Sequence, residues 1–171
     1  EVIMNNNRIE KLINLGNQVE ITINEKQAEK LIAYMDRLLE KNQHINLTRI
    51  TEEDEFIKLH LLDSLTLLKL IKNPQASILD VGTGGGFPGI PLAIFYPEVK
   101  FLLADSIAKK LKVVDAVAEG IGLKNISTLH TRAEEIKNRK FDFAVSRAVA
   151  PLKELWTWAR PLLRTKPVSA D

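Results

Sequence analysis

A cluster of glycines directly after a short apolar run constrains this chain more than any other feature. Five of its eight glycines lie between residues 82 and 89, and the apolar segment Ser77–Val81 precedes them. Such a run predicts a buried strand, and glycine suits the tight turn after it because it accepts positive φ. A turn of this kind leaves backbone N–H groups and a helix N-terminus facing a ligand. The sequence therefore predicts a nucleotide-binding turn at the end of a strand.

Beyond Pro74 the sequence alternates between strand and helix patterns. Predicted strands cover residues 77–81, 100–104, 126–130 and 141–146. Predicted helices cover residues 89–95, 108–121 and 151–163, the last with Pro151 in its first turn. Strands and helices that alternate at this spacing are typical of βαβ units. The chain is therefore predicted to be an α/β protein with a Rossmann-like, mainly parallel sheet and helices on both faces.

The segment before Pro74 follows a helical pattern with few turn signals. A short apolar set ends at Gly16, and a longer helix is predicted from Glu25, capped by Thr22 or Asn24. A further helix is predicted from Thr51, because the acidic residues that follow it suit the first turn of a helix. These patterns predict a helical extension that precedes the sheet.

We expect the helical extension to cover residues 1–73 and the Rossmann-like domain to cover residues 74–171. The end of the chain, Arg164–Asp171, is a polar tail that contains Pro167 and has no strand pattern. Doubly wound nucleotide-binding domains normally have more strands than the pattern provides here. We therefore expect a sheet without its C-terminal strands.

The residues around the turn bear on which nucleotide it holds. Gly84–Gly89 also satisfies G-x-G-x-x-G, the dinucleotide fingerprint, so NAD stays open. Pro88 lacks a backbone donor that a pyrophosphate would use, and Asp80 adds negative charge that favours a cationic sulfonium ligand over phosphates. Asp105 ends the next predicted strand and suits either cofactor, because a carboxylate there accepts hydrogen bonds from ribose hydroxyls. The alternative is that Asp105, or Ser106, caps the following helix.

Composition narrows the function classes further. The chain has a formal net charge of +2, which permits a nucleic-acid partner without arguing for one, and it has no cysteine. No apolar run approaches the length that spans a bilayer, and His44, His60 and His130 show no metal-ligand spacing. For His60 we expect a structural role in packing the extension on the sheet. We expect a cytoplasmic protein with neither a metal nor a membrane partner.

Several ordered motifs resemble one known family, and the resemblance covers about residues 25–163. The motifs that carry it are Asn46–Ile50 (NLTRI), His60–Leu65 (HLLDSL), Asp80–Pro91 (DVGTGGGFPGIP), Asp105–Ser106 with Lys109–Lys110, Arg132–Glu134 (RAE), Phe141–Asp142 and Ser146–Ala148 (SRA). The chain resembles the bacterial small-subunit ribosomal RNA methyltransferase G family, also called glucose-inhibited division protein B. It departs from the family in having Ala104 where leucine is usual, and in lacking the strands and Lys-Gly segment that follow the last helix.

The resemblance implies the class I methyltransferase fold. It also implies methyl transfer from S-adenosylmethionine to N7 of a guanine in 16S ribosomal RNA, free or within the small ribosomal subunit. Combined with the residue reasoning above, the predicted cofactor-binding residues are Asp80, Gly82, Gly84, Gly86, Phe87, Asp105, Ala133, Glu134 and Arg147. Arg147 follows a predicted strand and is expected to position the substrate or the cofactor carboxylate. Its alternative role is a surface ion pair.

The chemistry agrees with a chain that has no obvious nucleophile–base pair. N7 of guanine already carries a lone pair, so the enzyme mainly aligns nucleophile, methyl group and sulfur. Side chains cannot read this edge inside an A-form helix, so the target base should be unpaired or splayed. Basic residues that could contact phosphates are Arg49, Lys109, Lys110, Lys112, Arg132, Lys137, Arg139 and Lys140. The open alternatives are a methyltransferase for a small molecule or a protein, an NAD-type oxidoreductase domain, and a non-catalytic nucleotide- or RNA-binding module.

Overall fold

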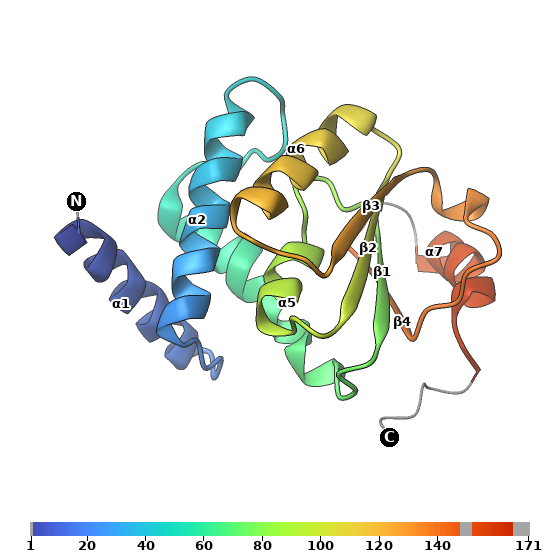
Figure 1. Cartoon of the computed structure of the whole chain (residues 1–171), viewed down its shortest axis with the longest axis horizontal. Coiled ribbons are helices and arrows are strands. Elements are labelled where there is room, and N and C mark those ends of the chain that lie inside the picture. Colours follow the sequence, from blue (N-terminus) through green and yellow to red (C-terminus); the bar gives the residue numbers. More distant parts are fainter. Residues whose placement is uncertain (1, 148–151, 166–171) are drawn as a thin grey trace.

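The computed structural model describes residues 2–147 and 152–165 and has an α/β architecture (Figure 1). The sheet within these residues has the order β3-β2-β1-β4, and every pair is parallel. Its strands are β1 (Ser77–Val81), β2 (Lys100–Asp105), β3 (Ile126–His130) and β4 (Phe143–Ser146). Strand order reverses between β1 and β4, and the crevice at such a switch point is where open α/β sheets bind ligands. The α/β fold class predicted from the sequence is confirmed.

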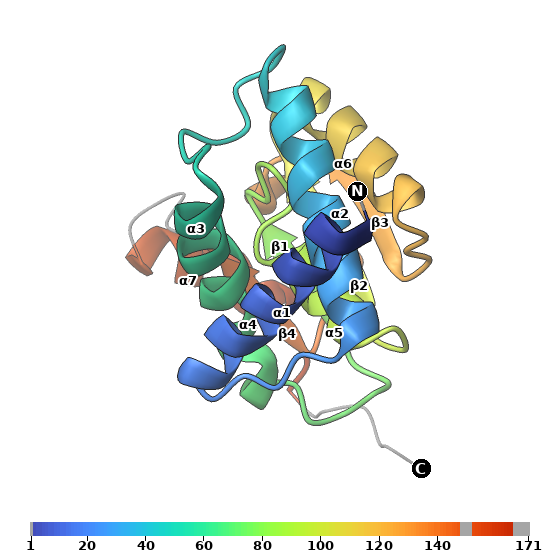
Figure 2. The same cartoon turned by 90° about the vertical axis from the view of Figure 1, so that its left-hand side faces the viewer.

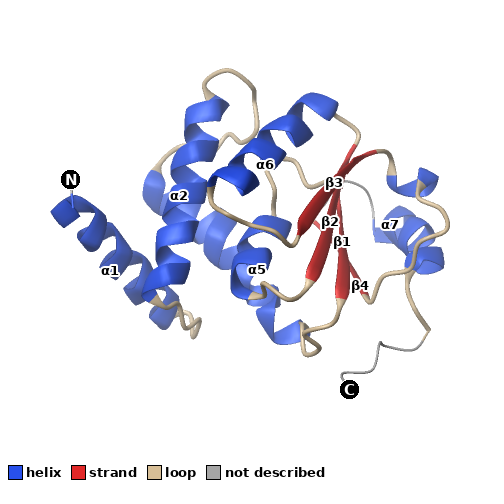
Figure 3. Ribbon diagram, viewed as in Figure 1, coloured by secondary structure: helices blue, strands red, loops and turns tan. Residues whose placement is uncertain are grey.

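Helices cover both faces of the sheet (Figure 3). On one face lie α5 (Gly89–Phe95) and α6 (Ala108–Gly120), and α2 (Glu25–Asn42) packs against these two helices from outside. On the other face lies α7 (Leu152–Ala159), which leads into the 3-10 turn η4 (Arg160–Leu162). Successive residues of β1 serve opposite faces, as a strand requires. Ile78 belongs to the large core shared with the N-terminal helices, and Leu79 to a smaller core beneath α7.

The longest helix, α2, begins where the sequence predicts. Asn24 accepts a hydrogen bond from the backbone N–H of Gln27, whose side chain accepts one from Asn24 in return. This capping box selects Asn24 over Thr22. The apolar set that ends at Gly16 lies within α1 (Val2–Gln18), which continues beyond this glycine. A Cβ on Gly16 would lie 2.7 Å from the carbonyl oxygen of Ile21, so this glycine permits a close backbone approach.

The segment predicted as one helix from Thr51 is broken into four helical pieces. They are α3 (Glu53–Phe56), the π-helical η1 (Ile57–Leu62), α4 (Asp63–Leu65) and the 3-10 η2 (Thr66–Leu70). The cap is Glu52 rather than Thr51, because the Glu52 carboxylate accepts from the backbone N–H groups of Asp54 and Glu55. Farther along, the hydroxyls of Ser64 and Thr66 donate to the carbonyls of His60 and Asp63. Such bonds compete with the helical ladder and explain its irregularity.

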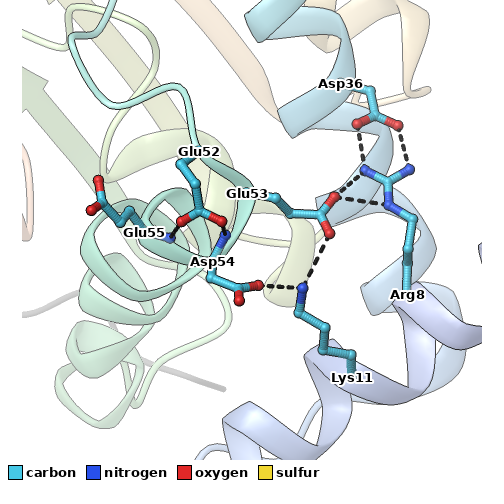
Figure 4. A network of polar contacts seen from close by, with 7 residues as sticks. All are labelled: Arg8, Lys11, Asp36, Glu52, Glu53, Asp54 and Glu55. Carbon is cyan, nitrogen blue, oxygen red and sulfur yellow. Dashed lines mark hydrogen bonds and ion pairs between the residues drawn. The ribbon is translucent and has the colours of Figure 1, made fainter.

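The first helix, α1, lies across the outside of α2 (Figure 2). Arg8 of α1 donates to Asp36 of α2 at 2.6 and 2.9 Å and to Glu53 of α3 at 2.6 and 2.9 Å (Figure 4). Lys11 adds ion pairs to Glu53 and Asp54. These pairs hold three helices together from one side, and the buried Leu12 supplies the apolar contact.

The predicted strand 141–146 is shorter than expected and begins at Phe143. Phe141 instead pairs with the segment after α7, since its N–H donates to Leu162 and its carbonyl accepts from Arg164. The predicted helix 151–163 is α7 followed by η4, and Pro151 lies outside the described residues. Residues 166–171 of the predicted polar tail also lie outside them. The division of the chain at residue 73 stays a prediction.

Candidate functional site

The glycine turn joins β1 to α5 at the carboxyl edge of the sheet. Gly82, Gly84 and Gly86 have φ values of 67°, 57° and 100°, in the left-handed region that other residues rarely adopt. The turn is tied to β2 because the N–H of Thr83 donates to the carbonyl of Ala104 at 3.0 Å. This arrangement explains why the sequence needs glycines directly after Val81.

A cleft of about 440 Å³ opens beside the turn, where the loops after β1, β2 and β3 meet. Five of the predicted cofactor-binding residues line it: Gly82, Gly84, Asp105, Ala133 and Glu134. Lys110 of α6 and Trp158 of α7 also line the cleft. Trp158 carries no sequence signal for this position, because nothing in a helical pattern tells which aromatic side chain faces a ligand.

Asp105 connects the cleft to the turn. One of its carboxylate oxygens accepts from the N–H of Gly84 at 2.9 Å, and the other accepts from the N–H of Ile107 at 2.9 Å. An ionised carboxylate offers about four acceptor sites, so these two bonds leave capacity for ligand hydroxyls. The alternative role, in which Asp105 or Ser106 caps α6, is not what the structure shows, because the N-cap position is Ile107 and no side chain caps the helix. Asp105 instead accepts from the N–H of the residue at the cap position.

The turn leaves room for a nucleoside on the side of the cleft. A Cβ added to Gly84 would meet no atom within 4 Å. A carboxylate at the end of β2 and backbone without side chains at the end of β1 are the groups that hold a ribose in Rossmann-like sites. The residues present fit a nucleoside cofactor such as S-adenosylmethionine.

Asp80 lies beneath the turn and is fully buried. Its Oδ2 accepts from the hydroxyl of Thr83 at 2.8 Å and from the N–H of Gly89 at 2.9 Å. Burial raises the pKa of this carboxyl to about 7, and the bonds from Thr83 and Gly89 oppose that rise. Its Oδ1 is buried and has no hydrogen-bond partner among the described residues. Its predicted interaction with a cationic cofactor group stays a prediction.

The other side of the turn packs against protein. Tyr34 of α2 donates its hydroxyl hydrogen to the carbonyl of Gly85 at 2.6 Å, and a Cβ on Gly86 would lie 2.6 Å from Cδ1 of Ile90. Phe87 is 5% exposed, and its ring stacks on that of His60 with centroids 4.1 Å apart. Gly86 and Phe87 therefore lie on the protein-facing side of the turn, and their predicted cofactor contacts stay predictions.

Arg147 follows β4 and contacts the N-terminal helices. Its Nη1 donates to Nδ1 of His60 at 2.9 Å, its Nη2 donates to the carbonyl of Leu59 at 3.1 Å, and Asp63 lies 3.9 Å away. The guanidinium also lies 5.5 Å from the centroid of the Phe87 ring. The ion pair that was the alternative role for Arg147 is present with Asp63, but it is one of several contacts that fix this side chain.

His60 links the extension to Arg147. Arginine only donates, so Nδ1 of His60 accepts and its proton lies on Nε2, which faces the hydroxyl of Thr48 at 2.7 Å. Burial, followed by the positive charge of Arg147, lowers the pKa of His60 to about 4. This neutral ring fits the predicted packing role, while its bond to Arg147 was not foreseen. The motif HLLDSL was the only available signal for it.

The described residues contain no cluster of His, Asp or Glu side chains that could hold a metal ion. Within the same residues, no helix is both long enough and apolar enough to cross a bilayer. The basic residues that we singled out for phosphate contacts are exposed, apart from the half-buried Lys110. Lys140 is engaged with the carbonyl of Pro161.

Comparisons with known proteins agree with this geometry. The family model described as rRNA small subunit methyltransferase G matches residues 27–168. The chain is 42% identical over 149 residues to "Ribosomal RNA small subunit methyltransferase G" of Acetivibrio thermocellus, covering 84% of this chain and 62% of that relative. It is 48% identical over 143 residues to the protein of the same description from Porphyromonas gingivalis, covering 83% and 64%. The chain thus spans slightly less than two thirds of these relatives.

Solved structures support the fold alone. A ribosomal protein L11 methylase from Lactobacillus delbrueckii has a TM-score of 0.52 at 20% identity, covering 62% of this chain and 55% of that one. A precorrin-6y C5,15-methyltransferase from Geobacter metallireducens has a TM-score of 0.50 at 14% identity, covering 70% and 60%. The sheet and its flanking helices therefore share the fold of these two proteins.

Proposed function

This chain belongs to the rRNA small subunit methyltransferase G family, and we propose that it binds S-adenosylmethionine for transfer of a methyl group to N7 of a guanine in 16S ribosomal RNA. One observation carries the cofactor part of this proposal. Gly82, the open backbone of Gly84 and the carboxylate of Asp105, which accepts from the N–H of Gly84, line one cleft at the carboxyl edge of the sheet.

Each group of residues in the cleft contacts a different part of the cofactor. Asp105 accepts hydrogen bonds from the ribose hydroxyls with the acceptor sites that Gly84 and Ile107 leave free. Gly82 and Gly84 allow close backbone approach, and Ala133 with Glu134 lies on the adenine side. When bound, the cofactor supplies an electrophilic methyl group on a sulfonium. The chain's own residues hold the nucleoside and orient it.

The acceptor requires alignment more than proton transfer. N7 of guanine has a free lone pair at neutral pH, and alignment alone contributes about 7–11 kcal/mol in favourable cases. Arg147 lies past the end of β4, held by His60 and Leu59, on the other side of the turn from Asp105. We assign Arg147 to the substrate rather than to the cofactor. Exposed basic residues such as Arg49, Lys109 and Arg132 supply phosphate contacts.

Calorimetric titration with S-adenosylhomocysteine and with NAD⁺ tests the cofactor assignment. We expect binding of S-adenosylhomocysteine only, and the reverse result would move the chain to the oxidoreductases. Trp158 lines the cleft, so its fluorescence should change on binding in the same titration.

A second assay tests the substrate. The chain is incubated with labelled S-adenosylmethionine and 16S ribosomal RNA, or small subunits, from a strain that lacks this modification. Label in the RNA that disappears when guanine is replaced by 7-deazaguanine supports N7 transfer. Label in RNA that survives this replacement contradicts it, and label only in protein or small molecules favours those alternative acceptors. A ribosomal substrate also implies action in the bacterial cytoplasm.

A further inference from the structure

A second cleft of about 430 Å³ lies beside Pro88, at the end of the glycine turn, whereas the cofactor cleft lies beside Gly82 and Gly84 at its beginning. One wall comes from α4 and η2, with Asp63, Ser64 and Leu67, and the other from the ends of the loops after β1 and β4, with Pro88 and Arg147. It therefore occupies the strand switch point between β1 and β4, where open α/β sheets bind ligands.

The polar groups that this cleft can offer are few. Ser64 and Thr66 both line it, but their hydroxyl hydrogens are used on carbonyls of their own segment, at 2.6 Å each. Asp63 is different, because its side chain is 61% exposed and faces Arg147 at 3.9 Å. Arginine has five N–H donors, and His60 and Leu59 engage one each. The cleft thus presents a carboxylate acceptor beside a guanidinium donor.

The carboxylate of Asp63 and the guanidinium of Arg147 together complement the hydrogen-bonding groups of guanine. Along its Watson–Crick edge, guanine presents the N2 and N1 donors next to the O6 acceptor, whereas adenine presents an acceptor at N1 and a donor at N6. We propose that this cleft holds the guanine that accepts the methyl group, with Asp63 accepting from N1 and N2 and Arg147 donating to O6. Leu67 and Pro88 supply apolar surface for the faces of the ring.

The orientation is consistent with the reaction. N7 lies on the side of the purine away from the N2 amino group. A base anchored at Asp63 on the helical wall therefore directs N7 toward the ends of β1 and β4, where Val81 and Gly82 begin the cofactor cleft. The inference rests on the proposed function, and it makes Asp63 a residue that determines base specificity.

The test is an NMR titration of the isotopically labelled chain saturated with S-adenosylhomocysteine. Guanosine, inosine and adenosine monophosphates are compared, because inosine lacks only the N2 amino group. We expect guanosine monophosphate to bind about tenfold more tightly than adenosine monophosphate, with inosine monophosphate between them, as a bidentate base contact discriminates. The shifted signals should include those of Asp63, Ser64 and Ser146.

Asp63→Asn should abolish the preference for guanosine over inosine monophosphate while leaving the affinity for S-adenosylhomocysteine unchanged. Glu55→Gln is the matched control, because it removes the same charge from an exposed position two helical turns away. Equal affinities of the unsubstituted chain for the three nucleotides, or absence of binding, would overturn the inference. Failure to bind S-adenosylhomocysteine would instead overturn the proposed function, so the two failures are distinguishable.

Discussion

The two sides of the glycine turn use the same residue type for different reasons. On the outer side, Gly84 faces open space, and an added Cβ would meet nothing within 4 Å. On the inner side, a Cβ on Gly86 would lie 2.6 Å from Ile90, and one on Gly89 would collide with Leu103 and lie 2.9 Å from Asp80. The outer glycine leaves room for a ligand, whereas the inner glycines leave room for the protein itself.

The contrast between Gly84 and Gly86 limits what a glycine motif can predict. Spacing alone does not distinguish a glycine that admits a ligand from one that admits a side chain. Substitutions on the outer side should therefore mainly lower the affinity for the cofactor. Substitutions on the inner side should mainly lower the free energy of unfolding.

The largest expected effect concerns Asp80 on the inner side, and it depends on pH. The pKa of Asp80 is raised from 3.8 to about 7, chiefly by burial. A carboxyl whose pKa is higher in the folded protein than in the unfolded chain stabilises the fold fully at pH values below its unfolded pKa. This contribution is lost as the pH rises through the folded pKa. The loss between about pH 4 and pH 7 is at most about 4 kcal/mol.

Asp80→Asn removes this ionisation while keeping an oxygen that can accept from Thr83 and Gly89. The variant should therefore gain stability relative to the unsubstituted chain as pH rises through this window. Urea unfolding of both proteins across the window measures the difference, with Asp115→Asn on α6 as control. A difference that does not change with pH would show that Asp80 carries no ionisation penalty.

The second effect concerns Asp105 on the outer side. Asp105→Ala removes a carboxylate whose charge-assisted bonds to ribose hydroxyls are worth about 1.5–3 kcal/mol each. We expect the affinity for S-adenosylhomocysteine to fall about a hundredfold, equivalent to about 3 kcal/mol. Calorimetry measures it, and Asp115→Ala, which removes a carboxylate that accepts from Thr128, is the matched control. Unchanged affinity would reduce Asp105 to a residue that holds the turn and α6.

Much of the fold could be predicted from sequence because strong local signals define it. The strands at 77–81 and 126–130 and the helix at 89–95 have the predicted bounds, since turn residues flank short apolar runs. The errors occur where distant contacts override local patterns. Phe141, for example, leaves the predicted strand to pair with Leu163, which follows η4.

The residues of the site also fall into those that a local pattern predicts and those that it does not. Asp105 could be predicted because the end of a parallel strand beside a glycine turn is a local pattern. The contact of His60 with Phe87 and Arg147 could not, because these residues are 27 and 87 positions away and meet only once the extension packs on the sheet. Residues that act through tertiary packing leave little trace in periodicity.

The third effect returns to the inner side. Gly89→Ala introduces a Cβ against Leu103 and Asp80 within a close-packed core. Overpacking of this kind destabilises by about 2 kcal/mol, and we expect that loss in urea unfolding. The folded fraction should still bind S-adenosylhomocysteine with little change in affinity. A variant with normal stability and weakened cofactor binding would place Gly89 functionally on the outer side.

The smallest effect on stability, and the sharpest test of the comparison, comes from Gly84→Ala. The φ of 57° costs a non-glycine residue about 1 kcal/mol, and no protein atom crowds the new methyl group. Gly122→Ala is a matched control, because Gly122 has a φ of 76°, equally open surroundings and a position outside the cofactor cleft. Both variants should lose similar stability. Only Gly84→Ala should bind S-adenosylhomocysteine more weakly, by about tenfold, because its methyl group occupies space that the ligand needs. If the two variants bind equally well, the open space at Gly84 does not belong to the cofactor, and the distinction between the two sides of the turn fails.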